Sequence, residues 1–280
     1  MEERSQLVNV AYRLLGSLTE AEDAVQEAYA RWFAMPAAQR AGIANPAAWL
    51  TRVAGRICLD VLGSARVRRE RYVGSWLPEP LPLVGDDLAG RIAADETVTM
   101  AFLVVLDSLT PAERVAFVLH DVFGYPFAEV AATLGRTAAA CRQLATSARQ
   151  RLRKADLPSP AAREASLVRD FRLAWEAMDI DRLVGLLDPN VTVIADGGGA
   201  VSTVARPITG RAQVARYAVG LPLAGQVFEE RPVNGRPGLV ARRDGVIVSV
   251  LAFGVTGDRI RDIWVVRNPA KLHHFLSSAS

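Results

Sequence analysis

At 280 residues, the sequence is longer than a typical single domain, so we expect two or three domains. Half of the residues are hydrophobic and 22% are charged, which excludes an intrinsically disordered chain. Two cysteines are too few for a disulfide framework or a zinc-cysteine site. The N-terminus lacks the pattern of a signal peptide, and no apolar run is long enough to span a membrane. These features predict a soluble, cytoplasmic protein that does not bind membranes.

The formal net charge of +3 is too small to indicate a binding partner, so the distribution of charge along the chain matters more. Helical spacing of apolar residues extends through the first 157 residues. Thr19 and Glu22 predict a capping box at the start of one helix. Asn45 and Pro46 predict the N-cap and the first residue of a second, longer helix.

The longer helix carries Arg52 and Arg56 on its polar face, and Trp49 on its apolar side. Trp49 could stack on an unpaired base, although core packing explains a lone tryptophan as well. On the preceding helix, Asp23 lies where the helix dipole favours acids. Glu27 lies further along that helix and indicates a basic protein partner.

The segment from Gly74 to Gly85 contains three prolines and cannot continue a helix. Its apolar residues include Trp76 and Leu77, whereas a solvated spacer would be rich in glycine, serine or charge. We therefore expect this linker to dock against another part of the protein.

A helix is predicted from Ile92 to Leu106, and Thr110–Glu113 forms a second capping box. A short helix at Phe127–Leu134, a tight turn at Gly135–Thr137 and a longer helix at Ala138–Arg153 follow. Two helices joined by a three-residue turn that contains glycine are typical of a helix-turn-helix.

Six basic residues and no acidic residue lie from Arg136 to Lys154, on the second helix of this motif and at its two ends. Binding to DNA phosphates requires such a cluster. Arg142 could bond guanine and Gln143 could bond adenine, while Arg136 and Thr137 lie at the helix start, where phosphates are favoured. A solvated basic helix face is the alternative explanation.

Pro158–Pro160 marks a second domain boundary. One or two helices follow, and after Asp188–Asn190 the sequence contains runs rich in valine and isoleucine. Gly238–Arg242 and Val246–Phe253 flank Asp244-Gly245, which predicts a hairpin. Helices followed by an antiparallel sheet predict an α+β domain.

The order of these features resembles a known family. AYRLLGSLTEAEDAVQEAYARWF at 11–33 and NPAAWLTRVAGRICLDVLGSAR at 45–66 are similar to region 2 of extracytoplasmic-function (ECF) sigma factors. Residues 109–154 are similar to region 4 of the same family. WLPEPLP at 76–82, DGGG at 196–199 and NPAKL at 268–272 resemble the signature motifs of one subgroup, which carries a C-terminal SnoaL-like domain of the NTF2-like fold.

The resemblance implies a multidomain fold. Two all-α sigma domains are expected, region 2 over residues 1–72 and region 4, with its helix-turn-helix, over 92–157. A linker over 73–91 joins them, and an α+β, SnoaL-like regulatory domain covers 166–280. The implied function is promoter-specific transcription initiation with core RNA polymerase, through its β′ clamp helices and its β flap. In this subgroup the fused domain regulates activity through the linker.

The resemblance also implies roles for individual residues. Contact with the β′ clamp helices falls to Asp23, Gln26 and Glu27. Recognition of the promoter −10 element falls to Asn45, Trp49, Arg52 and Arg56, and recognition of the −35 element to Arg136, Thr137, Arg142, Gln143 and Arg149. The interdomain regulatory contact is expected at Trp76, Leu77, Pro78, Glu79, Pro80, Asp196, Gly197, Gly198, Gly199, Asn268, Pro269, Lys271 and Leu272. The chain departs from the subgroup at Ala200, where lysine is usual, and at Ala270, where aspartate is usual.

SnoaL-like folds include enzymes, so catalysis has to be considered. It would need an acid or base such as aspartate or histidine inside the fold. The three histidines are His120, His273 and His274, and Asp196 is the candidate acid. We expect no enzymatic activity, no cofactor and no metal, and leave open an unknown small ligand in the C-terminal cavity. The alternative is a regulator that binds DNA without polymerase and carries a sensing or catalytic C-terminal domain.

Overall fold

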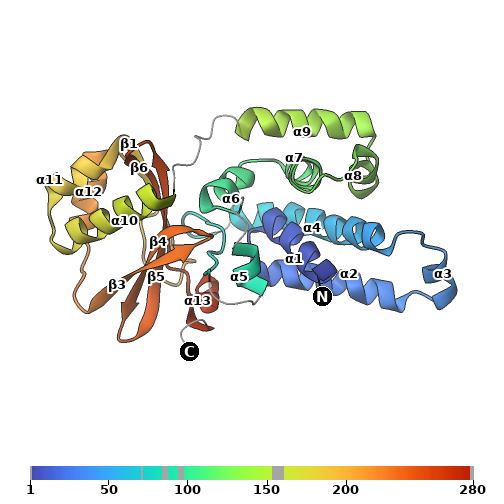
Figure 1. Cartoon of the computed structure of the whole chain (residues 1–280), viewed down its shortest axis with the longest axis horizontal. Coiled ribbons are helices and arrows are strands. Elements are labelled where there is room, and N and C mark those ends of the chain that lie inside the picture. Colours follow the sequence, from blue (N-terminus) through green and yellow to red (C-terminus); the bar gives the residue numbers. More distant parts are fainter. Residues whose placement is uncertain (1, 71, 84–87, 94–97, 153–160, 278–280) are drawn as a thin grey trace. The chain divides into compact units, whose positions relative to one another are not determined.

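The computed structural model describes residues 2–70, 72–83, 88–93, 98–152 and 161–277 (Figure 1). Predictions on Gly85, on Arg153 and Lys154, and on the Pro158–Pro160 boundary lie outside these ranges. The chain forms two compact units, each built from two segments of sequence. Unit 1 combines residues 1–71 with 103–155, and unit 2 combines 72–102 with 156–280.

Unit 1 is all-α, as predicted. Its helices are α1 (Glu2–Leu15), α2 (Leu18–Ala34), α3 (Ala37–Ala41), α4 (Pro46–Glu70), the greater part of α6 (Met100–Asp107), α7 (Pro111–Phe117), the π-helix η1 (Val118–Val122), α8 (Phe127–Leu134) and α9 (Ala138–Leu152). Helices α1, α2 and α4 pack on one another, and α4 also packs on α8. The helix-turn-helix therefore contacts the N-terminal bundle through α8.

Helix starts in unit 1 follow the capping signals with one exception. Asn45 accepts a hydrogen bond from the Ala48 amide at 3.0 Å, and the Thr110–Glu113 box has both of its bonds, as predicted. The predicted Thr19 cap is wrong, because Ser17 caps α2 by accepting from the Glu20 amide. Gly16, at φ +72°, reverses the direction of the chain directly after α1. Helix α2 therefore begins two residues before the predicted start.

The single helix predicted from Ile92 to Leu106 is also wrong. The structure has α5 (Leu88–Ala93) and α6, and residues 98–99 directly before α6 are not helical. The hydroxyl of Thr99 accepts a hydrogen bond from the Phe102 amide at 3.2 Å, which caps a new helix start. The continuous apolar periodicity concealed this cap.

Unit 2 is α+β, as predicted. After α5 it contains α10 (Ala161–Glu176), α11 (Ile180–Leu186), β1 (Leu187–Asp196), β2 (Ile208–Thr209), α12 (Arg211–Val219), β3 (Gln226–Val233), β4 (Arg236–Arg243), β5 (Val246–Thr256), β6 (Arg259–Val266), the 3₁₀ helix η2 (Pro269–Lys271) and α13 (His273–Ser277). The strand order is β2-β1-β6-β5-β4-β3. No helix in the described ranges has the length and apolar character that a membrane span requires.

The sheet is not purely antiparallel, which corrects the prediction. β1 runs parallel to β6, because the rest of the domain connects them instead of a hairpin, while the other strand pairs are antiparallel. The β4–β5 hairpin is confirmed. Its turn residues Asp244 and Gly245 have φ values of 51° and 78°, as a type I′ turn requires.

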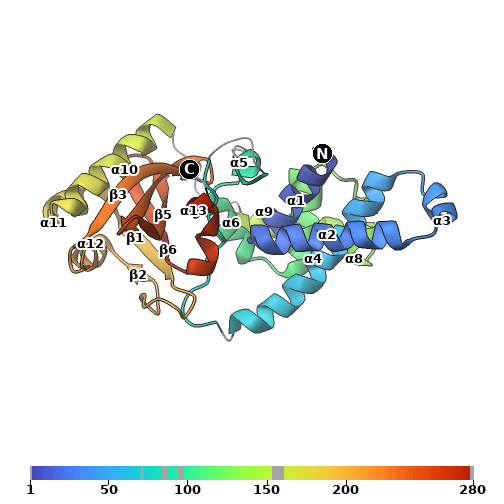
Figure 2. The same ribbon diagram turned by 90° about the horizontal axis from the view of Figure 1, so that it is seen from below.

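Helices α10, α11 and α12 cover one face of the sheet, and apolar side chains fill the space between these layers (Figures 1 and 2). Trp175 of α10 lies 4.7 Å from Phe228 between ring centroids, and Phe171 lies 5.4 Å from Phe253. The Trp175 indole donates a hydrogen bond to the Ala218 carbonyl at 2.8 Å, so its polar atom is satisfied.

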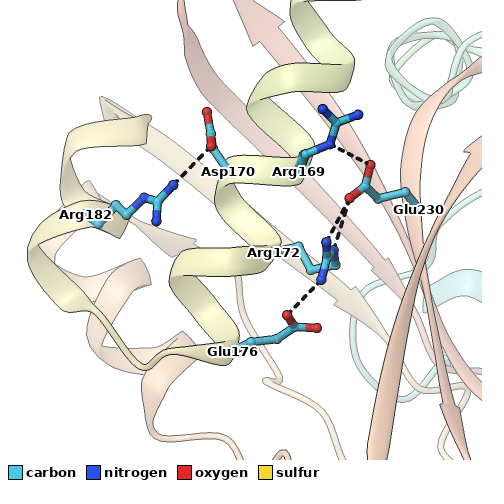
Figure 3. Close-up of polar contacts among 6 residues, drawn as sticks. All are labelled: Arg169, Asp170, Arg172, Glu176, Arg182 and Glu230. Atoms are coloured by element: carbon cyan, nitrogen blue, oxygen red, sulfur yellow. Dashed lines mark hydrogen bonds and ion pairs between the residues drawn. The ribbon is translucent and has the colours of Figure 1, made fainter.

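Ion pairs fasten α10 to β3 and to α11 at the edge of this core. Arg172 donates to Glu230 of β3 and to Glu176, and Arg182 of α11 donates to Asp170 of α10 (Figure 3). Exposed pairs of this kind each contribute roughly 0–1 kcal/mol. The apolar layer accordingly carries most of the stability, and the ion pairs help to orient the helices.

The opposite face of the sheet is buried as well. Val250 and Ala252 of β5 and Val266 of β6 are at most 4% exposed, although they do not belong to the core under α10–α12. α13 packs on β5, and the linker runs along the side of the sheet away from α10–α12 (Figures 1 and 2). This second layer is where the three predicted regulatory motifs meet.

Candidate DNA-binding and interdomain sites

The predicted −35 reading residues lie on and just before α9. Gly135, in the left-handed conformation, ends α8, and the hydroxyl of Thr137 caps α9 by accepting from the Ala140 amide at 3.2 Å. Cys141, Ala145 and Ala148 form the buried stripe of α9. Arg136, Thr137, Arg142 and Gln143 are exposed. The helix therefore presents polar side chains from its N-terminal half to solvent.

Arg149 differs from the other predicted −35 residues. Its Nε lies 2.6 Å from the Asp121 carboxylate, so its charge is already paired within unit 1. The Arg142 guanidinium lies 5.4 Å from the centroid of the Phe127 ring, a cation–π contact that keeps its donors exposed. Of the two, only Arg149 is thus engaged by a carboxylate of unit 1 among the described contacts.

Glu113 anchors the helix-turn-helix to α7. Besides its capping box, its carboxylate accepts a hydrogen bond from the Ser147 hydroxyl of α9 at 2.6 Å, and Arg151 lies 3.6 Å away. Burial opposes ionisation and acts to raise the pKa of Glu113. The hydrogen bonds from Ser147 and Thr110, together with the charge of Arg151, outweigh burial and lower that pKa below its ordinary value of 4.5.

Replacing Glu113 by glutamine should reduce the free energy of unfolding by about 1–2 kcal/mol at neutral pH, as for other lost helix caps. The pKa is lower in the folded chain, so the contribution of the carboxylate is present at neutral pH and is lost as the pH falls through the folded value. Urea unfolding at several pH values should show E113Q and the parent chain converging in acid. Asp60→Asn, which alters an exposed acid, is the control and should change little. A constant gap at all pH values would contradict this role.

The residues predicted to contact polymerase, Asp23, Gln26 and Glu27, are all exposed on α2. Glu27 pairs with Arg31 one turn later on the same helix. Phe33, near the end of α2, is 66% exposed and stacks on Tyr29. The exposed phenylalanine was not predicted, since its position fits the apolar spacing of the helix.

Three of the predicted −10 residues line a cavity of about 260 Å³ inside unit 1. Asn45, Trp49 and Arg52 contribute from α4 and the residue before it, and Tyr125 and Glu129 contribute from the opposite side. Trp49 also packs on Trp32, with ring centroids 5.2 Å apart, and Arg56 is exposed. The predicted −10 surface thus faces the helix-turn-helix in this structure.

Further contacts join the two halves of unit 1. The buried Arg114 of α7 donates to the Leu14 carbonyl of α1 at 2.9 Å and to Asp107 at 2.7 Å. The buried Arg13 of α1 lies 5.2 Å from the centroid of the Phe123 ring. The sequence does not distinguish these arginines from surface arginines, so both contacts were missed.

In unit 2, the buried carboxylate of Asp196 brings the linker and both C-terminal motifs together. It accepts hydrogen bonds from the Tyr72 hydroxyl at 2.6 Å, the Leu77 amide at 3.0 Å and the Lys271 ammonium at 2.7 Å. Lys271 also donates to the Leu77 carbonyl, and the Asn268 amide donates to the Tyr72 hydroxyl at 3.0 Å. We call these five residues the Asp196 cluster.

Charge in the Asp196 cluster is shielded from water. Asp196 is fully buried, and the side chain of Lys271 is 11% exposed. The Lys271 ammonium also lies 4.2 Å from the centroid of the Trp76 ring. Burial, followed by the hydrogen bond to Asp196, raises the pKa of Tyr72, which keeps its hydroxyl protonated as a donor.

The glycines after Asp196 allow the backbone there to lie close to Val201 and to the side chain of Asn268. A Cβ on Gly197 would lie 2.0 Å from the Val201 carbonyl oxygen, and one on Gly198 would lie 2.4 Å from the Asn268 side chain. Gly198 also has a φ of +64°. Ala200 and Ala270, where the chain departs from the subgroup, are exposed, so neither side chain is needed in this cluster.

The rest of the linker motif is buried or hydrogen-bonded to the β3–β4 hairpin. Leu77, Pro78, Glu79 and Pro80 are buried, as is Leu272, whereas Pro269 is exposed. Leu81 exchanges hydrogen bonds with Asn234, and Pro82 bridges Val233, so the linker pairs with the β3–β4 hairpin. Asn234-Gly235 is a strong hairpin sequence, and it connects β3 to β4, a hairpin that was not predicted.

Comparison with known proteins identifies the family of the chain. Residues 1–71 match the family described as Sigma-70 region 2, and residues 99–152 match Sigma-70, region 4. The chain is 39% identical to the ECF RNA polymerase sigma factor SigJ of Mycobacterium tuberculosis, over 96% of this chain and 90% of SigJ. The chain belongs to the ECF sigma factors. A probable ECF sigma factor of the same species, SigI, is 33% identical over 96% of this chain and 92% of its own length.

The fold of this ECF sigma factor matches a solved structure. The crystal structure of Mycobacterium tuberculosis SigJ superposes with a TM-score of 0.80 at 37% identity, covering 98% of this chain and 96% of SigJ. The match extends over the C-terminal α+β domain as well as the two helical regions. The predicted family and fold class are thereby confirmed.

Proposed function

We propose that this ECF sigma factor binds core RNA polymerase and directs initiation at promoters that carry a −10 and a −35 element. The observation that carries the proposal is the exposed N-terminal half of α9, which presents Arg142 and Gln143 at the position of a recognition helix. The exposed acids of α2 are available to the basic surface of a polymerase subunit, which we assign to the β′ clamp helices. Region 4 would contact the β flap.

The arrangement of unit 1 adds a requirement for opening. Asn45, Trp49 and Arg52 face the helix-turn-helix across the cavity, whereas the −10 and −35 elements are separate stretches of DNA. In this proposal, α4 and α8 move apart so that both elements can be contacted at once. We assign the described arrangement to a resting state.

The C-terminal domain holds the linker in this proposal and so controls that opening. The linker joins region 2 to region 4, and the Asp196 cluster fixes its first part to the sheet. The linker and two motifs far apart in the sequence meet at one buried ion pair, between Asp196 and Lys271. This supports a specific contact between the linker and the C-terminal domain. Whether the held linker favours or opposes initiation is decided by transcription assays on the cluster variants.

We infer a regulatory domain without catalysis, in a protein that acts in the cytoplasm. The layer between α10–α12 and the sheet is filled with aromatic and aliphatic side chains. Asp196, the candidate acid, is engaged by Tyr72, Leu77 and Lys271. A small ligand in this domain is not needed for the proposed contact.

Run-off transcription with core polymerase tests the function. Arg142→Ala should lower initiation at promoters with an intact −35 element by an amount equivalent to roughly 1–3 kcal/mol, because a bidentate base contact is lost. Arg142→Lys should recover little of the lost initiation, since lysine cannot donate two parallel hydrogen bonds to one base. Arg182→Ala, which removes an exposed charge in unit 2, is the control. A parent chain that starts no transcript with core polymerase at any promoter would overturn the proposal.

A further inference from the structure

A cluster of two histidines and a buried glutamate lies where the linker meets α13. The Oε1 atom of Glu79 lies 3.0 Å from Nε2 of His274 and 3.4 Å from Nε2 of His273. One ligand atom from each of the three residues lies within 4.8 Å of the other two. We propose that these side chains bind a divalent transition metal ion, with zinc the best fit.

The spacing fits a tetrahedral ion. Ligand atoms about 2.1 Å from zinc in tetrahedral geometry lie about 3.4 Å from one another. Both distances from the glutamate oxygen are close to this value, and the separation of the two imidazole nitrogens is limited to 4.8 Å. The distances between the three ligand atoms are therefore compatible with one shared ion.

Hydrogen bonding sets the orientation of His273. Its Nδ1 atom lies 2.9 Å from the Ala270 carbonyl oxygen, which can only accept a hydrogen bond. Nδ1 therefore carries a proton, which leaves Nε2, the nitrogen on the side of Glu79, to bind a metal ion. A carbonyl that holds the distal nitrogen in this way is the usual support of a metal-binding histidine.

His274 points to the same conclusion. Its Nε2 is buried and, although 3.0 Å from Glu79 Oε1, makes no hydrogen bond among the residues that the structure describes. A buried imidazole nitrogen left without a hydrogen bond beside a carboxylate is unfavourable, and a cation between the two groups removes this cost. A metal ion satisfies both imidazoles and the carboxylate together.

The position of the cluster gives an ion a route from solvent. Glu79 is 2% exposed, whereas the side chains of His274 and His273 are 20% and 43% exposed. Two histidines and one carboxylate are a frequent ligand set for zinc with one open position, which water can fill here. The sequence predicted no metal because Glu79 and the histidines lie at opposite ends of unit 2 in the chain.

Metal binding would tie the linker to the C-terminal domain at a second point, beyond the Asp196 cluster. This consequence rests on the proposed function, since the linker joins the two promoter-reading regions. Binding itself does not require that function, so it can be measured without polymerase.

Calorimetric titration of the full-length chain, freed of metal with a chelator, with zinc chloride tests the site. We expect one zinc ion per chain, an increase in melting temperature on addition of zinc, and a visible absorption spectrum of nitrogen and oxygen ligation when cobalt(II) is used instead. The double variant His273→Gln/His274→Gln should lose at least the 10- to 100-fold in affinity that loss of a supporting partner costs. Glu79→Gln should bind zinc more weakly than the parent chain.

His120→Gln is the matched control, because it replaces the remaining histidine, which lies in unit 1. It should bind zinc as the parent chain does. Circular dichroism in the absence of metal establishes that each variant is folded, so that lost binding reports on the site. Equal affinity of the parent chain and the double variant, or no binding by the parent chain, would overturn the proposal.

Discussion

Asp196→Asn should reduce the free energy of unfolding of unit 2 by about 3–5 kcal/mol, the usual cost of removing one partner of a buried ion pair. The substitution keeps the shape of the side chain but leaves the charge of Lys271 buried beside a neutral amide. Denaturant unfolding monitored by tryptophan fluorescence measures the loss. Limited proteolysis should at the same time show faster cleavage in the linker, because asparagine keeps only one of the two oxygens that accept from Tyr72 and Leu77.

Two controls isolate the ion pair from a general effect of asparagine. Asp170→Asn alters an exposed pair with Arg182 and should cost no more than about 1 kcal/mol. Combining Asp196→Asn with Lys271→Met removes both charges and should recover much of the stability. Equal losses for the two aspartates would show that the Asp196 cluster does not hold the linker. The transcription assay on Asp196→Asn then shows how the held linker affects initiation.

Gly55→Leu should raise the apparent affinity for core polymerase by separating α4 from α8. A Cβ at position 55 would lie 2.8 Å from the Thr133 methyl group, which can rotate away only if the Thr133 hydroxyl gives up its hydrogen bond to the Glu129 carbonyl. Overpacking of this kind costs about 1–3 kcal/mol. If that cost falls on the resting state, the population of molecules with α4 and α8 apart rises about 5- to 150-fold. The apparent dissociation constant for polymerase then falls until this open form predominates.

Gly63→Leu is the matched control, since Gly63 lies on the same helix and a Cβ there meets nothing within 4 Å among the described residues. Polymerase binding measured by fluorescence anisotropy should rise for Gly55→Leu and stay unchanged for Gly63→Leu. Equal binding by both variants would contradict the assignment of the resting state. Circular dichroism shows whether each variant keeps its helices.

The helical regions were predictable because their signals are local. The Thr110–Glu113 capping box, the Gly135 turn and the buried stripe through Cys141 lie within a few residues of the bonds they specify. The Asp244-Gly245 hairpin was predictable for the same reason. Two helix starts were predicted wrongly, at Thr19 and near Thr99. In both places the apolar spacing continues across the residue that caps the helix, so it does not mark where the helix begins.

Long-range pairings were not predictable from such signals. The parallel pairing of β1 with β6 depends on the path of the whole domain. The apolar linker correctly indicated docking, and the resemblance indicated which motifs belong together, but nothing local marked Tyr72 or Asn234 as partners. The buried Arg114 and the Glu79–histidine cluster likewise become apparent only when distant segments are placed together.

The order of synthesis gives the Asp196 cluster a further consequence. The partners of Leu77 in this cluster lie 119 and 194 residues later in the chain. At the usual 5–20 residues per second, a ribosome needs roughly 10–40 s to proceed from the linker to Lys271. Both sigma regions are therefore synthesised before the Asp196 cluster, which holds their linker, can form. Each newly made molecule passes through an interval in which its sigma domains are complete and the domain that we propose to regulate them is not.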